Sequence, residues 1–532
     1  MGIFISVEKT IECVIIAVIF SVLLAGCCYR LLGILQSGGY NGKKFIKWTK
    51  KKSNLVFTRH ILLTMLCALS VAVISLCFSF IGEWAAIVGL AGYAIFLPLY
   101  IWADNKVALK VPVTATPRYK RLYVILAFFT AVFVYLCVTL LNFASEVWGN
   151  AIFEYFRYVP LSLFGLLLIP MVLFANLVSK IYEVPHNKKF VKRARQKLSS
   201  SHIKVIGITG SYGKTSTKQI LSSILSKKFK VLATPRSHNT PLGLALSINN
   251  NALDDFDVFI AEMGARNVGD IAELCDLCPP DYSIITGICP QHLESFLSLE
   301  NIVKAKGEIL LSTKQKAVVA SDCIELFHNY PCEKIKCDCA SEISCDSSGS
   351  TFKLKLGGES VIVKTKLLGR HAVDNIALAA EIAFELGMTA AEIAEAVEGL
   401  EFIEHRLQLI EANGVNILDD GYNSNIKGAA AAIEVLKYFK GSKIAVTPGL
   451  VELGILEESE NRALGERLVG LDMVILVGDT LVQPVKAGYI AAGGDAEKIA
   501  LVPTLDKAQD MLRTIIKAGD AVLFLNDLPD IY

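Results

Sequence analysis

The stretch Ile203-Lys-Val-Ile-Gly-Ile-Thr-Gly-Ser-Tyr-Gly-Lys-Thr-Ser216 decides how the fold of this chain is read. Its first seven residues are mostly apolar and predict a short buried strand. Apolar residues at helical spacing follow it, namely Ile220, Leu221, Ile224 and Leu225. A glycine-containing turn therefore joins a strand to a helix, which is the setting in which backbone N–H groups surround phosphate groups.

The turn itself supplies the residue types that phosphate binding needs. Glycines let the backbone curl round the phosphates, Lys214 neutralises their charge, and Thr215 can hold Mg²⁺ at the helix N-terminus. The spacing departs from the common phosphate loop, because Ile208 stands where that pattern has its first glycine. The residues predicted to bind the nucleotide in this loop are Gly210, Ser211, Gly213, Lys214, Thr215 and Ser216.

The N-terminal third of the 532-residue chain has a different character. Hydrophobic residues make up 53% of the whole chain, and the apolar excess lies almost entirely in that third. Five stretches are long and apolar enough to cross a bilayer as helices. They are Cys13–Tyr29, Ile61–Ile81, Trp84–Ala103, Tyr123–Leu141 and Val159–Ser179. No cleavable signal peptide is expected, because the first apolar run lacks a basic start and an A-x-A-like exit.

Lysine and arginine crowd the first loop, the third loop and the segment after the fifth span, whereas the alternate loops hold almost none. By the positive-inside rule, the N-terminus lies outside and everything after Lys180 lies in the cytoplasm. Topology alone accounts for the basic clusters, and binding of anionic lipid headgroups or a lipid diphosphate is the alternative. The spans contain few ionisable residues, which argues against an ion pathway.

The remaining composition excludes some classes of function. A net charge of +2 gives no reason to expect a nucleic-acid partner. Of the fourteen cysteines, several lie in apolar runs, where a thiol behaves as a small hydrophobe. Cys275 and Cys278 form one C-x-x-C motif without a second pair at zinc-ribbon spacing. Reduced cytoplasmic thiols are therefore predicted, with a zinc site left open.

From Ile203 to Gly454 the sequence resembles the Mur ligases, which build the peptide of bacterial cell-wall precursors. Within that family the resemblance is to the MurF branch, which adds D-alanyl-D-alanine. Eight short matches in the family's order are not expected by chance. They lie at Thr209–Ser216, Phe259–Ala265, Thr286–Glu294, Val303–Glu308, Gly369–Asn375, His405–Leu407, Asp419–Asn425 and Thr447–Gly454.

The resemblance implies two Mg²⁺ sites. Glu262 would bind the first ion together with Thr215, and His292 would help to bind the second. Lys306 matches the lysine that is carbamylated in the family. Carbamylation by CO₂ converts a cation into a carboxylate-like oxygen ligand, which suits Mg²⁺. The residues implied to be catalytic are Lys214, Glu262, His292, Lys306 and Arg406.

The resemblance also assigns the rest of the nucleotide site. Asn375 would contact adenine, Arg406 would reach the γ-phosphate, and Asp420 would bind the ribose. Two positions depart from the family's pattern, because Ala372 replaces an asparagine and Ile426 stands where proline is usual.

The implied reaction is an ATP-dependent carbon–nitrogen ligation that releases ADP and phosphate. A cell-envelope carboxylate would be phosphorylated to an acyl phosphate, and an amino acid or dipeptide amine would attack it. Apolar spans occupy the place of the family's UDP-sugar-binding domain, and the chain ends in Asn526–Tyr532 rather than in a K-G-S-R-like element. The acceptor is therefore either nucleotide-linked or lipid-linked. The alternatives are a poly-γ-glutamate or folylpolyglutamate-type ligase and a non-catalytic, membrane-tethered nucleotide-binding partner. An ATP-driven transporter is disfavoured, since no L-S-G-G-Q-like signature is present.

The expected fold is an α-helical membrane domain of five spans followed by α/β domains. We expect a transmembrane domain over residues 1–182, a basic linker over 183–202, a Mur-ligase-like P-loop ATPase domain over 203–402 and a Rossmann-type C-terminal domain over 403–532. In the last of these, predicted helices alternate with short apolar strands, which indicates a doubly wound sheet. The helices are Gly428–Phe439, Glu457–Val469 and Leu505–Ala518, and the strands are Ile444–Val446, Met473–Val477, Ile499–Val502 and Ala521–Leu525. Strands and turns are expected over residues 313–365.

Overall fold

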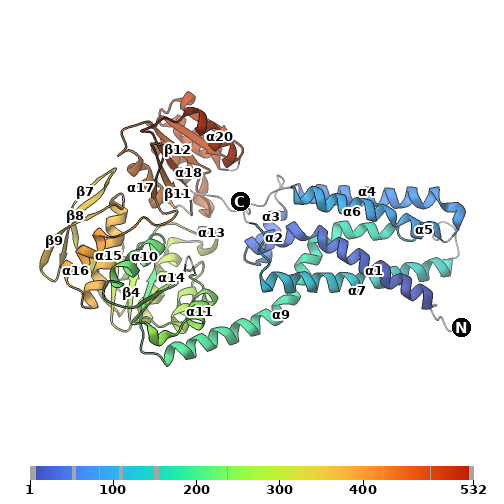
Figure 1. The fold of residues 1–532 in the computed structure, drawn as a ribbon, viewed down its shortest axis with the longest axis horizontal. Helices are drawn as coiled ribbons and strands as arrows, with labels where there is room; N and C mark the ends of the chain where they lie inside the picture. The colour runs from blue at the N-terminus through green and yellow to red at the C-terminus, as the bar shows by residue number, and fades with distance from the viewer. Residues whose placement is uncertain are drawn as a thin grey trace. The chain divides into compact units, whose positions relative to one another are not determined.

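The computed structural model describes residues 7–50, 55–82, 84–106, 112–148, 155–235, 238–422, 425–479 and 481–525 (Figure 1). Two compact units divide the chain, with the boundary between His186 and Asn187. The first unit is helical, and the second contains three β-sheets. Asn423, Ser424 and residues 526–532, which entered the comparison with the family's motifs, lie outside the described residues.

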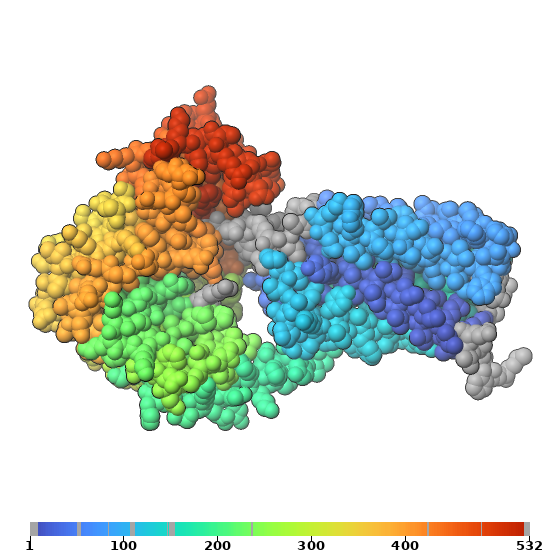
Figure 2. Space-filling view, in the orientation of Figure 1, coloured from blue at the N-terminus to red at the C-terminus, as the bar shows by residue number. Residues whose placement is uncertain are grey.

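Five segments in the described residues are long and apolar enough to cross a membrane, which confirms the predicted number and order of spans. They are Lys9–Cys27 in α1 (Val7–Cys27), Val56–Cys77 in α4, Trp84–Asn105 in α5 and α6 (Trp84–Gly89 and Ala91–Asn105), Pro117–Ser145 in α7 (Pro117–Trp148), and Val159–Ser199, which includes α9 (Phe164–Ser199). In Figure 2 the dark-blue side chains of α1 form a strip that has α4 and α6 on one side and α7 on the other. Helix α1 packs against α7. Leu69, Val124 and Leu140 are about two-thirds exposed, as side chains that face lipid would be.

The segment expected to be a basic linker, residues 183–202, is largely helical, because α9 continues to Ser199. Its charged residues are interleaved with Phe190, Ala194 and Leu198, which recur every four residues and so share one helical face. That face packs against the core of the second unit. The four-residue period therefore explains why this basic stretch is a helix with a buried side.

The first sheet of the second unit is parallel, with the strand order β2-β3-β1-β4-β5-β6. Helices cover both faces, and each face has its own apolar core. The strands are β1 (Lys204–Thr209), β2 (Val231–Ala233), β3 (Val258–Glu262), β4 (Tyr282–Ile285), β5 (Lys316–Ala320) and β6 (Glu333–Cys337). On one face lie α10 (Lys214–Leu225), α15 (Arg370–Glu385) and α16 (Ala390–Glu398), and on the other lie α11 (Pro241–Asn250), α12 (Asp270–Leu277) and α14 (Leu299–Ser312).

A small antiparallel sheet of β7 (Ala340–Asp346), β8 (Gly349–Leu356) and β9 (Glu359–Thr365) packs against α15 and α16. Its apolar residues Phe352, Leu354 and Val363 belong to the same core as α10 and α15. The stretch over residues 313–365 thus contains the strands that the sequence predicts there, which are shared between two sheets.

The third sheet has the order β10-β11-β15-β12-β13-β14 and is parallel except for the hairpin of β10 (Gln408–Ala412) and β11 (Val415–Asp420). The four predicted strands and three predicted helices are present, with ends that differ by a few residues. They are β12 (Lys443–Thr447), β13 (Met473–Val477), β14 (Ile499–Val502), β15 (Ala521–Leu525), α17 (Ile426–Leu436), α18 (Glu457–Arg467) and α20 (Leu505–Ile515). One further helix, α19 (Val482–Ala491), was not predicted.

Candidate active site

The candidate site lies at the carboxyl edge of the first sheet. In the strand register Ile208 of β1 pairs with Glu262 of β3, and Thr209 pairs with Ile285 of β4. The phosphate loop after β1, the carboxylate at the end of β3 and the segment after β4 therefore emerge side by side. Parallel strands place their following loops at one edge, which is where open α/β sheets bind ligands.

Two positions of the phosphate loop require glycine. The φ angle of Gly210 is +149°, and a Cβ there would lie 2.1 Å from Oγ1 of Thr286. The φ angle of Gly213 is +76°, and a Cβ there would lie 2.6 Å from Oδ1 of Asn375. Both the left-handed conformation and the close approach exclude a larger residue. The loop leads into the N-terminus of α10, and helix N-termini suit the binding of phosphate groups.

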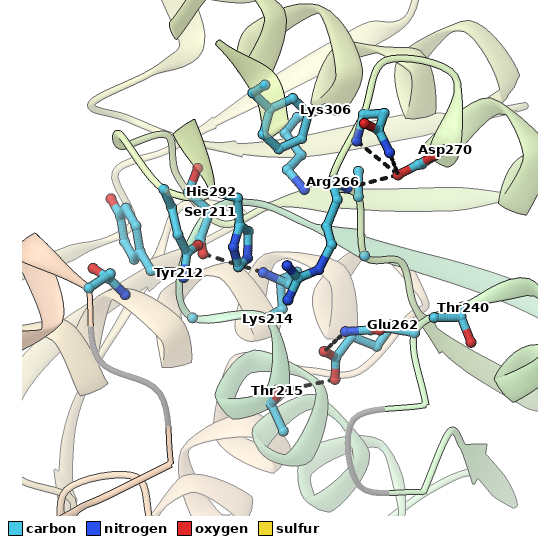
Figure 3. Close-up of a pocket in the computed structure, with 18 of the residues that line it drawn as sticks. Ser211, Tyr212, Lys214, Thr215, Thr240, Glu262, Arg266, Asp270, His292 and Lys306 are labelled. Carbon is cyan, nitrogen blue, oxygen red and sulfur yellow. Dashed lines mark hydrogen bonds between the residues drawn. The ribbon is translucent and has the colours of Figure 1, made fainter. Parts of the chain in front are cut away.

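A cavity of about 490 Å³ opens above this loop. Figure 3 shows the side-chain nitrogen atoms of Lys214, His292 and Lys306 turned toward one shared space. The predicted site residues that line the cavity are Ser211, Gly213, Lys214, Thr215, Ser216, Glu262, His292, Lys306 and Arg406.

The residues predicted to hold the nucleoside lie beside this cavity. Asn375 lines a smaller adjoining cavity of about 30 Å³, to which Ser216 and Arg406 also contribute. Asp420 is not among the lining residues of either cavity; its Oδ1 accepts the backbone N–H of Leu407 at 3.2 Å. The phosphate side and the nucleoside side of the predicted site thus meet at Ser216 and Arg406.

The environment of Asp420 leads to a prediction about pH. Burial raises the pKa of Asp420 to about 7, although nearby Arg406 opposes this. The folded protein therefore keeps a proton that the unfolded chain loses near pH 4, so stability falls as the pH rises from about 4 to about 7 and levels off above it. We expect Asp420→Asn to raise the melting temperature of the nucleotide-free protein at pH 8 and to change it little at pH 4. A thermal-unfolding series from pH 4 to pH 8 measures this, and an equal effect at both ends of the range would contradict it.

Glu262 is held by three side chains and is 1% exposed. Its Oε2 accepts hydrogen bonds from Oγ1 of Thr215 and from Nζ of Lys218, both at 3.0 Å. Its Oε1 accepts one from Nδ2 of Asn239 at 3.1 Å. Lys218 and Asn239 were not predicted as site residues, although Lys218 lies one helical turn after Lys214.

The Lys218–Glu262 pair predicts a large stability effect. Both side chains are no more than 2% exposed, so removal of the lysine leaves a buried carboxylate with less compensation. We expect Lys218→Met to destabilise the protein by about 3 kcal/mol or more. The exposed pair of Lys228 and Glu392 is the control, because Lys228→Met should have almost no effect. Denaturant unfolding of both variants measures this, and equal effects would contradict the assignment.

Two buried lysines line the cavity. Nζ of Lys214 donates to the carbonyl oxygen of Gly210 at 2.7 Å, and burial lowers the pKa of Lys214 below its ordinary value. Burial lowers the pKa of Lys306 further, and the neighbouring Lys214 adds to this. Among the described residues, Lys306 has no carboxylate within ion-pair distance. The side-chain nitrogens of Lys214 and Arg406, which line the cavity, are hydrogen-bond donors of the kind that bind a polyanionic ligand such as a triphosphate.

His292 is fixed from a distant part of the sequence. Its Nδ1 contacts the carboxylate of Glu452, which also accepts a hydrogen bond from the guanidinium of Arg266 at 2.9 Å. Burial would raise the pKa of Glu452, but the contacts with His292 and Arg266 outweigh it and hold that pKa below its usual range. Arg266 lines the cavity, yet neither it nor Glu452 was predicted to be functional. No local sequence pattern predicts a functional role for Arg266 or Glu452, because the two loops that carry them come together only in the folded structure.

The donor set fits Mg²⁺ in part. The Thr215 hydroxyl and the Glu262 carboxylate are hard oxygen ligands of the kind this ion prefers. His292 and an unmodified Lys306 would not make an oxygen-rich site, whereas a carbamylated Lys306 would contribute one. In the described part of the chain no three His, Cys, Asp or Glu residues gather as a metal site. The fourteen cysteines are unpaired thiols.

Two family models match this part of the chain. The model of the Mur ligase middle domain matches residues 208–383, and that of the Mur ligase, glutamate ligase domain matches residues 405–526. Together they account for more than half of the chain. All the predicted site residues lie within these two segments.

Individual relatives point to one branch of that family. UDP-N-acetylmuramoyl-tripeptide–D-alanyl-D-alanine ligase of Escherichia coli (strain K12) is 29% identical over 292 residues, which are 52% of this chain and 64% of that relative. The ligase of the same name from Mycobacterium tuberculosis (strain CDC 1551 / Oshkosh) is 28% identical over 375 residues, covering 63% and 72%. The crystal structure of MurF ligase from Thermotoga maritima in complex with ADP is 29% identical with a TM-score of 0.58, covering 65% and 81%. The chain thus spans less than two-thirds of the E. coli relative.

Proposed function

This chain belongs to the Mur ligase family of ATP-dependent amide-bond ligases, and from that membership we propose that it is a membrane-anchored ligase of this kind. It activates a carboxylate of a cell-wall precursor as an acyl phosphate and couples it to an amine. The observation that supports this best is the cavity, in which the phosphate-loop residue Lys214 faces Glu262, His292 and Lys306.

The first chemical step is phosphoryl transfer from ATP. A carboxylate oxygen of the acceptor attacks the γ-phosphorus, the bond from that phosphorus to the β–γ bridging oxygen breaks, and ADP leaves. The reactants are both anionic, so their repulsion must be screened before they can align. Lys214 and Arg406 supply fixed positive charge on the phosphate side of the cavity. Bound Mg²⁺ would add charge screening there, held by Thr215 and Glu262 at one position and by His292 with carbamylated Lys306 at the other.

The second step forms the amide. The amine nitrogen attacks the carbonyl carbon of the acyl phosphate, the bond from that carbon to the phosphate-bearing oxygen breaks, and phosphate leaves with its electron pair. The amine proton passes to solvent or to the departing phosphate. Arg266 and Asp270, which also line the cavity, are available to orient the amine substrate.

The acceptor is proposed to be lipid-linked. Five apolar helices precede the first residue matched by the family models, and they give the chain direct access to membrane lipids. With the N-terminus outside, the loops that carry most lysine and arginine lie in the cytoplasm, together with the two ligase domains. The proposed location is the bacterial plasma membrane.

The test is a screen of ATP turnover by the detergent-solubilised full-length protein, with wall precursors offered in nucleotide-linked and in lipid-linked form. We expect ADP release with a lipid-linked carboxylate and an amino acid or dipeptide. Turnover only with nucleotide-linked precursor would overturn the lipid part of the proposal. Turnover only with glutamate and a polyglutamate or folate acceptor would favour that alternative ligase. An absence of turnover with every acceptor would favour a non-catalytic nucleotide-binding partner.

A further inference from the structure

Glu452 connects the two ligase domains through Arg266 and His292, which line the cavity. It belongs to the C-terminal segment Thr447–Gly454, whereas its partners Arg266 and His292 follow strands β3 and β4 of the first sheet. The side chains of Glu452 and His292 are 13% and 17% exposed, so the contact is largely shielded from water. A charge contact with so little solvent screening is stronger than the same contact at the surface.

The backbone on both sides of this contact is unusual. The φ angles of His292 and Glu452 are +54° and +63°, and neither residue is glycine. Such conformations are sparsely populated and persist where the surrounding structure holds them in place, which happens most often at functional sites. Nearby, Gly454 has a φ angle of +58°, and a Cβ there would lie 3.3 Å from the backbone nitrogen of Glu294. The two loops are therefore shaped for close approach.

A second contact between the domains differs in character. Lys427 of α17 contacts Asp322 at 2.6 Å and the hydroxyl of Tyr212 at 3.2 Å. The side chains of Lys427 and Asp322 are nearly half exposed, at 47% and 46%. Surface pairs of this kind contribute little. Of these two contacts, the Glu452 contact is the shielded one, and it is made to Arg266 and His292, which line the cavity.

We propose that Glu452 is a positioning residue that prepares His292 for cation binding when the C-terminal domain closes; this rests on the proposed function. A carboxylate at Nδ1 keeps the proton on that nitrogen and leaves the lone pair of Nε2 free for a metal ion. The same carboxylate holds the guanidinium of Arg266 beside the cavity. Because Glu452 arrives from the other domain, His292 is oriented only while the domains are together, and closure thereby controls the second cation site.

The first test measures protection from hydrogen exchange in the full-length protein in detergent, with Mg²⁺ and a non-hydrolysable ATP analogue. In the wild type, we expect the analogue to protect both residues 286–297 and the phosphate loop. In Glu452→Ala the protection of 286–297 should be lost while that of the phosphate loop remains. The matched control is Glu458→Gln, an exposed carboxylate outside the cavity lining, which should behave as the wild type. Equal protection of 286–297 in Glu452→Ala and the wild type overturns the proposal.

The second test measures binding of a fluorescent ATP analogue as Mg²⁺ is titrated. Loss of a residue that orients a metal ligand lowers metal affinity by about 10–100-fold. We expect Glu452→Ala to raise the half-saturating Mg²⁺ concentration by at least about tenfold, and Glu452→Gln to recover part of it, since its amide oxygen still accepts from Nδ1–H. In a His292→Ala background, Glu452→Ala should have no further effect. Additive effects, or a Mg²⁺ requirement within twofold of the wild type, overturn the proposal.

The two hypotheses fail in different ways. Neither test needs an acceptor substrate, so both can be read even if the screen finds no turnover. If the wild type turns over ATP and Glu452→Ala behaves as the control does, the proposed ligase function stands and the proposed role of Glu452 is wrong. If Mg²⁺ does not affect binding of the analogue by the wild type, both the proposed function and the proposed role of Glu452 are contradicted.

Discussion

Replacement of Lys214 by alanine is expected to reduce acceptor-dependent ATP turnover by at least about 10³-fold, because a buried cation that stabilises phosphoryl transfer is lost. Lys214 lies against the phosphate loop, where Nζ donates to the carbonyl oxygen of Gly210 at 2.7 Å. No other lysine in the described residues occupies that position, so the charge is not replaced. Steady-state ADP release by the full-length variant measures the loss.

The matched control for this prediction is Lys227→Ala. Lys227 follows the end of α10, the helix that begins at Lys214, and its side chain is exposed. Its removal should leave turnover within about twofold of the wild type, as most surface substitutions do. A Lys214→Ala variant that keeps a tenth or more of wild-type turnover would show that the loop is not the site of phosphoryl transfer.

Replacement of Lys306 by alanine should have the second-largest effect, a loss of turnover of about 10²-fold or more, because a ligand of one proposed Mg²⁺ disappears. Lys306 is 3% exposed, and burial lowers its pKa well below the ordinary value, which favours the neutral amine that reacts with CO₂. The matched control is Lys304→Ala, which removes an exposed lysine from the same helix.

The proposed carbamate at Lys306 can be tested for directly. In ¹³C-labelled bicarbonate, the wild type should show a carbamate resonance that Lys306→Ala lacks and Lys304→Ala retains. Because protonation of the amine competes with CO₂, the resonance and the turnover should both decline as the pH falls. A wild type without this resonance, or with turnover indifferent to bicarbonate removal, would contradict the assignment of Lys306.

Local patterns in the sequence predicted correctly the strand, turn and helix that contain the proposed phosphate loop. Strand, turn and helix there are adjacent in the chain, and each is set by nearby residues: apolar residues before Gly210, glycines in the turn and a four-residue period after it. Glu262 and His292 were assigned by the family resemblance, and the structure places both after strands that are parallel to β1.

Contacts between distant loops could not be predicted in this way. Asn239 reaches Glu262 from the loop before α11, and Gly264 has no side chain where a Cβ would lie 2.7 Å from the amide of Asn239. Glu452 meets Arg266 only because two domains come together. A single sequence carries no periodic signal for such pairs, since their spacing depends on the packing of whole domains.

Helix α19 was missed for a different reason. Pro484 lies in its first turn and Gly488 in its interior, and both residue types weaken a helical pattern. The packing explains the glycine, because a Cβ at Gly488 would lie 1.9 Å from the carbonyl oxygen of Arg462 in α18. Gly465 of α18 faces the carbonyl of Val485 equally closely. Close packing between α18 and α19 thus requires glycine at positions where glycine weakens the helical pattern of the sequence.

The most direct test of the central claim follows one oxygen atom. The acceptor that supports turnover is prepared with ¹⁸O in its carboxylate, and the phosphate released by the full-length protein is analysed by mass spectrometry. If ATP activates the carboxylate as an acyl phosphate, one ¹⁸O atom passes from each carboxylate that reacts into the released phosphate. Product amide accompanied by phosphate without ¹⁸O, or by AMP and diphosphate, would contradict the account.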